Sequence, residues 1–209
     1  MNQITKKKLS DGREYSVRHN RSRYFYPKEW LETMKHIRPY QEITFKFMIN
    51  TGVRINEGRE VQVKDIDFEN KRMLIRWQKV KAKKKEKHPV PRPIRISTQF
   101  TRWLKGYVKR NNLAPGDKLG FLSTSAANVC LKKAVKKAGI EDYLMFSSHN
   151  IRKTFENWLL ALTRNEMTVL RHVGHSKDVA LSSYVSPDMF SHEEKKMIRK
   201  ILGDIYEER

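Results

Sequence analysis

Three short segments of the sequence contain the residue types that can bind and attack a phosphodiester. They are residues 51–57 (TGVRINE), 149–152 (HNIR) and 173–176 (VGHS), and a tyrosine follows the histidine of the last segment after nine residues. Each has an ordinary structural interpretation when taken singly. An arginine and a glutamate one helical turn apart are usually a surface ion pair, and a lone tyrosine is usually half-buried. Only the combination of the three segments indicates chemistry.

The order and spacing of these segments resemble the tyrosine recombinase, or phage integrase, family. The boxes of that family read T-G-x-R-x-x-E, then a lysine in a β-hairpin, then H-x-x-R, then G-H followed nine residues later by tyrosine, and all occur here in order. Asp65-Ile66 and Val90-Pro91 resemble the family's step into the hairpin and the strand after it. The resemblance covers about residues 27–184. Among the varieties of the family, the lysine-rich sequence favours an archaeal viral or plasmid integrase.

The resemblance implies a DNA strand transferase. Arg54 and Arg152 would clamp the phosphate, because guanidinium groups match the charge on its non-bridging oxygens. His175 would donate a further hydrogen bond, and His149, titrating near neutrality, would handle the proton of the Tyr184 hydroxyl. Tyr184 would attack phosphorus, leaving a 3′-phosphotyrosyl link and a free 5′ hydroxyl. A second strand can reverse this step without ATP, and the resemblance implies no metal or other cofactor.

In this family a hairpin lysine protonates the leaving 5′ oxygen, and several lysines compete for that role here. Counting forward from the strand before the loop selects Lys79, whereas counting back from Val90-Pro91 selects Lys83. We favour Lys79, because residues 73–78 then form a strand of the expected length. The remaining loop lysines are expected to contact DNA phosphates, or else to form a solvated loop. They are Lys81, Lys83, Lys84, Lys85 and Lys87.

The elements that must position these residues are mostly helices. Apolar residues at helical spacing predict one helix from Pro27 and another from Pro39 that ends at Gly52. A short amphipathic segment over residues 54–63 follows, and Gly58, at a position where the family has apolar residues, predicts a short or distorted helix. Further helices are predicted around residues 100–108, 129–135 and 151–162, with a shorter one ending at Gly174.

Two strands, over residues 73–77 and 90–96, are predicted on either side of the lysine loop. Pro89, Pro91 and Pro93 recur at every second residue of the second strand. Because proline cannot donate to a central strand ladder, this strand must lie at a sheet edge or be irregular. The predicted fold class is mainly α with a small antiparallel β-sheet, as in a tyrosine recombinase catalytic domain.

The predicted organisation has three parts. Residues 1–26 are expected to form a mobile basic N-terminal arm, and residues 27–190 the catalytic domain. Residues 191–209 predict an amphipathic helix with a capping box, Ser191 and Glu194, that packs on its own domain or on a neighbouring protomer. The family's N-terminal core-binding domain has no room here. The chain is therefore expected to be an excised catalytic fragment or a minimal enzyme.

The composition indicates the partner. With 44 Lys and Arg against 23 Asp and Glu in 209 residues, the formal charge is +21, which favours a polyanion such as nucleic acid. The single cysteine, Cys130, excludes an internal disulfide and argues against a structural zinc. We expect double-stranded DNA as the partner and a homo-oligomer, a tetramer, assembled on it. No signal peptide or membrane-spanning stretch is apparent, so a cytoplasmic protein, in the nucleoid or host cell interior, is expected.

Two alternatives to a recombinase remain open at this point. A type IB topoisomerase has similar chemistry but releases supercoils instead of exchanging strands. A non-catalytic DNA-binding protein would use the same arginines and histidines only as phosphate contacts, so the removal of one contact would weaken binding and flatten its salt dependence.

Overall fold

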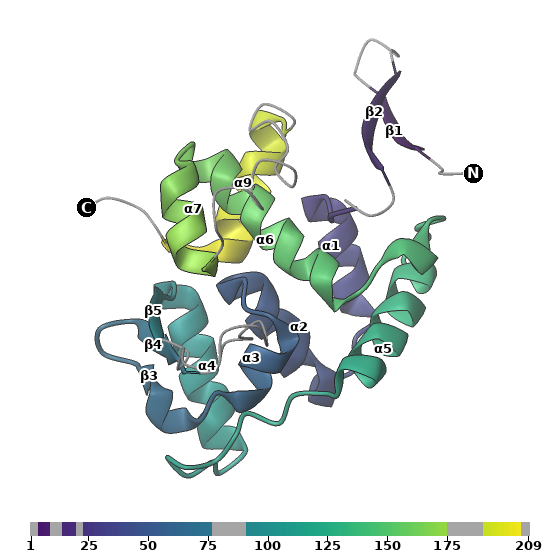
Figure 1. Cartoon of the computed structure of the whole chain (residues 1–209). Helices are drawn as coiled ribbons and strands as arrows, with labels where there is room; N and C mark the ends of the chain where they lie inside the picture. The colour runs from purple at the N-terminus through teal and green to yellow at the C-terminus, as the bar shows by residue number, and fades with distance from the viewer. Residues whose placement is uncertain (1–3, 9–13, 20–22, 77–90, 175–189, 206–209) are drawn as a thin grey trace, which may run out of the picture.

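The computed structural model describes residues 4–8, 14–19, 23–76, 91–174 and 190–205. Figure 1 shows a helical body with one small sheet at its side and a separate hairpin near the N-terminus. This agrees with the predicted fold class. The helices are α1 (Pro27–Lys35), α2 (Pro39–Thr51), α3 (Ile55–Glu60), α4 (Thr98–Arg110), α5 (Thr124–Lys137), α6 (Ser148–Thr163), α7 (Glu166–Val173) and α9 (His192–Leu202), with short 3-10 turns at Val63–Asp65 and Tyr143–Met145.

Local capping signals explain where several helices begin and end. The hydroxyl of Ser97 accepts from the backbone amide of Phe100 at the start of α4, and the hydroxyl of Ser191 accepts from the amide of Glu194 at the start of α9. Helices α2 and α7 end where Gly52 and Gly174 adopt left-handed backbone conformations, with φ of 64° and 71°. These two turns lie in the first and the third of the segments that resemble the family's catalytic motifs, residues 51–57 and 173–176.

The larger of two hydrophobic clusters is built around α6. Figure 1 shows this helix running through the middle of the molecule, between α7 and α9 at one end and α1 and α5 at the other. Ile151, Phe155, Trp158 and Leu159 of α6 are all fully buried. The helix that carries His149 and Arg152 is therefore held by the core over most of its length, so those two side chains have a rigid base.

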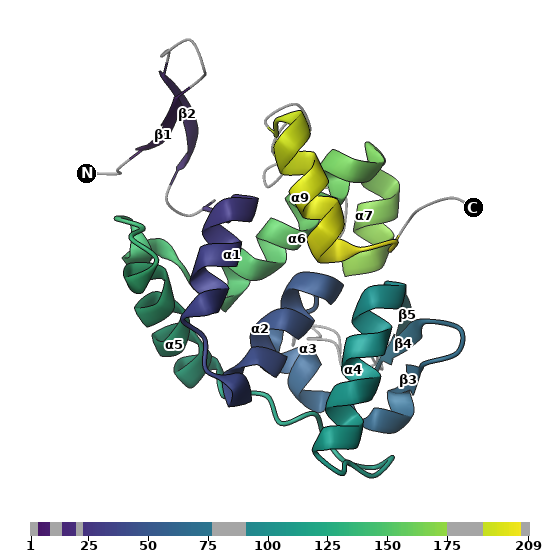
Figure 2. The same ribbon diagram turned by 180° about the vertical axis from the view of Figure 1, so that it is seen from behind.

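The second cluster lies between α2, α4 and the small sheet, which Figure 2 shows beside α4. The sheet is antiparallel, in the order β3 (Ile66–Asp67), β4 (Arg72–Ile75) and β5 (Arg92–Arg95). The prediction that the proline-containing strand lies at an edge is confirmed, since β5 pairs only with β4 among the described strands. Strand β3 was not predicted, since it is only two residues long.

The N-terminal region, predicted as a basic arm, contains a hairpin and a packed segment. Residues Ile4–Lys8 (β1) and Glu14–His19 (β2) pair as an antiparallel hairpin that stands apart from the helical body in both views. Residues 23–26 belong to the core: Tyr24 and Phe25 have no exposed surface, and the Trp158 indole donates to the carbonyl of Phe25 at 3.0 Å. The packed body therefore begins before the predicted boundary at residue 27.

The C-terminal helix α9 packs on α1 and α6 of its own chain, which is one of the two arrangements expected for it. Its residues Ile198 and Leu202 are fully buried, and Ile205 just beyond it is 1% exposed. None of the helices in the described parts of the chain has the length and apolar character needed to cross a membrane.

Candidate active site

The turn between α2 and α3 positions Arg54. Gly52 ends α2 in a left-handed conformation, and the Phe155 ring of α6 lies so close that a Cβ on Gly52 would be 2.2 Å from its Cδ1 atom. Arg54 then serves as the N-cap of α3, and Glu57 caps it in return by accepting the backbone amide of Arg54 at 2.9 Å. Helix α3 is short, as predicted, and the Phe121 ring packs where Gly58 has no side chain.

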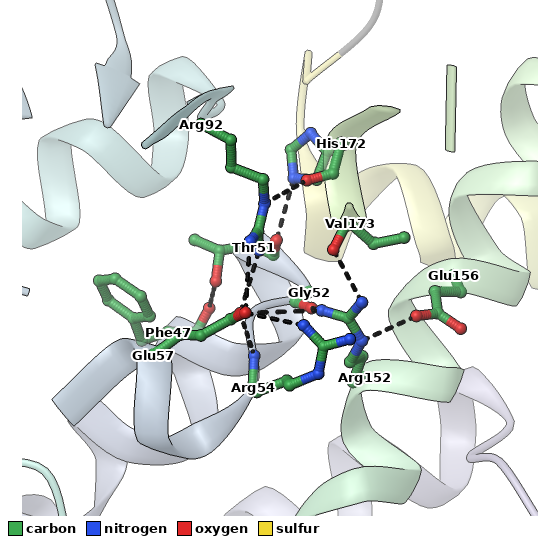
Figure 3. Close-up of polar contacts among 10 residues, drawn as sticks. All are labelled: Phe47, Thr51, Gly52, Arg54, Glu57, Arg92, Arg152, Glu156, His172 and Val173. Atoms are coloured by element: carbon green, nitrogen blue, oxygen red, sulfur yellow. Dashed lines mark hydrogen bonds and ion pairs between the residues drawn. The ribbon is translucent and has the colours of Figure 1, made fainter. Parts of the chain in front are cut away.

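Glu57 is the central hydrogen-bond acceptor of the site. Its spacing from Arg54 would instead suggest an ordinary surface ion pair. Its side chain is fully buried, and its Oε1 accepts from Arg54 Nη1 at 2.8 Å. Arg92 of β5 donates to Oε1 at 3.3 Å and to Oε2 at 3.0 Å, and Arg152 Nη1 lies 3.9 Å from Oε2. Burial acts to raise the pKa of Glu57, but the hydrogen bonds and charges of its partners outweigh it and lower the pKa. Figure 3 shows the three arginines around this carboxylate.

Arg152 holds two turns together. Its Nη1 donates to the carbonyl of Gly52 at 2.7 Å and its Nη2 to the carbonyl of Val173 at 2.8 Å, while its Nε forms an ion pair with Glu156 at 3.0 Å. The side chain has no more than 1% of its surface exposed. Burial lowers the pKa of Arg152 to about 10, which leaves it protonated at neutral pH.

His172 makes a second tie between the same two turns. Its Nε2 lies 2.9 Å from the carbonyl oxygen of Thr51, and since a carbonyl only accepts, Nε2 carries the hydrogen. Arg92 Nε donates to the carbonyl of His172 at 3.2 Å. Complete burial lowers the pKa of His172 to about 3, so the ring is neutral at physiological pH. The end of α7 is thereby fixed against the end of α2.

His149 occupies the first turn of α6 and is exposed to solvent. Desolvation by the surrounding protein, followed by the charges of Lys153, Arg152 and Arg54, lowers its pKa to about 4. This lowered pKa differs from the expected titration of His149 near neutrality. The positive residues around it disfavour the imidazolium form, and the neutral ring that remains can accept a proton.

Of the predicted catalytic residues, Arg54 and Arg152 both lie within ion-pairing distance of Glu57, and the charges of both act to lower the pKa of His149. Of the two arginines, Arg54 is the accessible one, with 37% of its side chain exposed. The other predicted site residues lie outside the described residues: Lys79, Lys81, Lys83, Lys84, Lys85, Lys87, His175 and Tyr184.

Sequence reasoning missed three residues of this site, Arg92, Glu156 and His172. Each breaks a local pattern. Arg92 stands between two prolines on an edge strand, Glu156 follows Arg152 by four residues on the buried side of α6, and His172 lies on the apolar side of α7. A charged residue on a buried face needs a partner, and this is the signal that could have found them.

Comparison with known proteins identifies the family of this chain. Residues 23–190 match the sequence model of the phage integrase family. The sequence is 29% identical over 142 residues to tyrosine recombinase XerA of Saccharolobus solfataricus, an alignment that covers 68% of this chain and 44% of that protein. The chain thus spans less than half the length of this curated relative.

Solved structures show a similar fold. A crystal structure of XerA recombinase has a TM-score of 0.62 at 16% identity, covering 85% of this chain and 62% of that one. The Tn1549 transposon integrase in complex with circular intermediate DNA has a TM-score of 0.61 at 17% identity, covering 84% and 64% of the two chains. The family model matches the greater part of the sequence and includes the two segments that supply Arg54, His149 and Arg152. The chain therefore belongs to the phage integrase family.

Proposed function

We propose that this chain is the catalytic part of a site-specific DNA recombinase, or integrase, that cuts and rejoins DNA through a 3′-phosphotyrosyl bond to Tyr184. One observation carries the proposal: Arg54 and Arg152, about a hundred residues apart in the chain, both pair with one buried carboxylate, and the charges of both lower the pKa of His149. Membership of the phage integrase family supports it. Such a cluster of cations is suited to the charge that builds on a phosphodiester during transfer.

Each described residue has a role in this proposal. Arg54, the accessible arginine, binds a non-bridging oxygen of the scissile phosphate. Arg152 holds the Gly52 and Val173 turns in place and adds its charge from the interior. His149, neutral in the free protein, accepts the proton of the attacking phenol. In the cleavage step the Tyr184 oxygen forms a bond to phosphorus, and the bond to the 5′ oxygen breaks.

The remaining roles fall to residues outside the described part of the chain. Lys79 would protonate the leaving 5′ oxygen, with Lys83 as its rival, and His175 would donate to the phosphate. Gly174 is described and ends α7 directly before His175. Attack by the 5′ hydroxyl of a second strand on the phosphotyrosyl bond would release Tyr184 and complete strand exchange, with no net consumption of phosphate-bond energy.

Double-stranded DNA is the proposed partner, with a homo-oligomer, a tetramer, assembled on it inside the cell. The net charge of +21 supports a polyanionic partner. The similarly folded XerH recombinase has been solved bound to its difH substrate in a post-cleavage complex, with a TM-score of 0.57 at 18% identity, covering 86% of this chain and 52% of that one. The loop lysines, Lys81, Lys83, Lys84, Lys85 and Lys87, are proposed to contact phosphates.

The decisive experiment uses duplex DNA nicked close to the cut, so that the released fragment diffuses away and the covalent intermediate accumulates. Wild-type protein should form a protein–DNA adduct in the presence of EDTA, and Tyr184→Phe should form none. An adduct that persists in Tyr184→Phe, or a wild-type protein that binds DNA without forming any adduct, would contradict the proposal. Joining of two different duplexes, rather than relaxation of one, separates a recombinase from a topoisomerase.

Arg54→Ala tests the role of the accessible arginine. We expect it to retain most of its DNA affinity and to lose cleavage by about 10²-fold or more, the scale found when a transition-state donor is removed. Arg59→Ala is a matched control, because Arg59 is an exposed arginine on the same short helix. The two variants remove the same charge, so a difference between them in cleavage reflects position and not overall electrostatics.

A further inference from the structure

Arg92 occupies an unusual place for an arginine. It lies on the edge strand β5 between exposed Pro91 and Pro93, yet its side chain is only 11% exposed. Strand alternation turns Arg92 and Ile94 to the inner face and Pro93 and Arg95 outward. The strand therefore directs one positive charge into the interior, and the proposed catalytic steps do not involve this charge.

The contacts of Arg92 join three parts of the site. Its two Nη atoms donate hydrogen bonds to the two carboxylate oxygens of Glu57, and its Nε donates to the His172 carbonyl. Its Cδ lies 3.3 Å from the position that a Cβ on Gly174 would take. Figure 3 shows Arg92 reaching down from its strand to Glu57, past the end of α7. Arg92 thus links the sheet, the α2–α3 turn and the end of α7.

Phosphate binding by Arg54 would take one hydrogen-bond partner away from the Glu57 carboxylate. Arg54 donates Nη1 to Glu57 and is also the arginine that a phosphate meets first. A phosphate competes with Glu57 for that guanidinium, because both are anions that bind the same fork of donors. A fully buried carboxylate that loses its partner is strongly destabilised. The nearest nitrogen of Arg152 is 3.9 Å away, beyond hydrogen-bonding distance.

We propose that Arg92 is a positioning residue of the active site, which keeps the buried Glu57 carboxylate paired while Arg54 turns to the scissile phosphate. This inference rests on the proposed function. The two hydrogen bonds from Arg92 to Glu57 do not involve Arg54, so they persist when the Arg54 side chain moves to the phosphate. Glu57 then continues to cap α3 through the backbone amide of Arg54 and holds that helix in place.

The inference predicts a specific pattern of defects. Arg92→Met removes the charge and keeps a long side chain, and we expect the single-turnover rate of adduct formation at saturating DNA to fall about tenfold or more at pH 7. DNA affinity should change much less. Part of the lost rate should return as the pH is raised, because an unpaired buried Glu57 ionises only at higher pH. The rate of adduct formation by Arg92→Lys should lie between those of wild type and Arg92→Met, since an ammonium group keeps the charge but cannot contact both carboxylate oxygens in the same way.

Arg95→Met is the matched control. Arg95 belongs to the same strand but is exposed on its outer face, so this variant removes the same charge without touching Glu57. We expect wild-type cleavage from it. The inference would be overturned if Arg92→Met cleaved DNA at the wild-type rate at every pH, or if Arg95→Met lost as much activity as Arg92→Met. In either case, adduct formation by wild-type protein would still support the proposed function.

A second measurement does not depend on catalysis. We expect Arg92→Met to lower the melting temperature, and the loss to be much smaller when the same substitution is made in Glu57→Gln, because the neutral amide needs no counter-charge. An equal loss in both backgrounds would show that Arg92 does not act through Glu57 and would overturn the inference. Absence of any adduct from wild-type protein would refute the proposed function instead, and the melting-temperature comparison would still decide whether Arg92 pairs with Glu57.

Discussion

Arg152 donates a 2.7 Å hydrogen bond to the carbonyl oxygen of Gly52, a residue 100 positions earlier in the chain. Its other Nη atom binds the Val173 carbonyl in the same way. Both carbonyls belong to helix ends that lead into proposed catalytic segments. Arg152 therefore holds the site together from the inside, in addition to the charge that it contributes.

Removal of the Arg152 side chain should destabilise the fold. Arg152→Ala leaves Glu156 buried beside an empty space and two carbonyls without their donor, so we expect a loss of about 3–5 kcal/mol in the free energy of unfolding. Urea denaturation measures this loss. Arg59→Ala, an exposed arginine, should stay within about 0.5 kcal/mol of wild type. A similar small effect for Arg152→Ala would contradict the structural role described here.

Gly52 and Gly139 form a matched pair for a steric test. Both have positive φ, 64° and 76°, but a Cβ at Gly52 would collide with Phe155, whereas a Cβ at Gly139 would have no neighbour within 4 Å. Each substitution by alanine carries the strain of a left-handed backbone, and Gly52→Ala should lose about 1–3 kcal/mol more because of overpacking. Thermal or urea unfolding of the two variants gives the difference. Equal losses would mean that the Phe155 contact relaxes freely.

His172 should make stability depend on pH. Its pKa is about 3 in the folded protein and near 6.5 when unfolded, so the unfolded chain binds the extra proton between these values. Its contribution is fully present above pH 6.5 and is lost as the pH falls, by up to about 1.4 kcal/mol per pH unit. Unfolding measured from pH 7 to pH 4 should show a shallower decline in His172→Gln than in wild type. Parallel curves would contradict the burial of a neutral histidine.

His149 should stay deprotonated to an unusually low pH in the free protein. Because its pKa is lowered to about 4, an NMR titration of its ring protons should show a midpoint well below the ordinary histidine value of about 6.5. If His149 accepts the phenol proton, the acid limb of kcat/KM for adduct formation should follow the same low value. A midpoint near 6.5 would show that neither desolvation nor the neighbouring cations act on His149 as described.

The C-terminal helix should be part of the folding unit. Leu202→Ala empties a fully buried position and should cost about 2–5 kcal/mol, while Leu144→Ala, at a position that is 60% exposed, should change little. Urea denaturation compares the two. Deletion of residues 191–209 would remove the same contacts, so substitutions of exposed residues on α9 are the cleaner test of its role between protomers. An unchanged stability in Leu202→Ala would argue against packing of α9 on its own chain.

Local signals in the sequence determined much of this protein. Helical periodicity, the Ser191–Glu194 capping box and the glycines at 52 and 174 predicted elements that the structure contains, because each signal acts within one or two helical turns. The proline spacing placed β5 at an edge for the same reason. Two of the three motifs also identified Arg54, His149 and Arg152, and the fold places Arg54 and Arg152 at one carboxylate.

Tertiary structure alone decided how those residues are held. Glu57 is a buried hub and not a surface partner because Arg92 and Arg152 converge on it from distant segments. The low pKa of His149 results mainly from the protein that surrounds it, and the core position of Tyr24 and Phe25 results from their packing beside α6. Burial and charge pairing are properties of the packed chain, and residues that are remote in sequence create them. A pattern read along the chain therefore names the chemical groups, while packing determines their charge state and their partners.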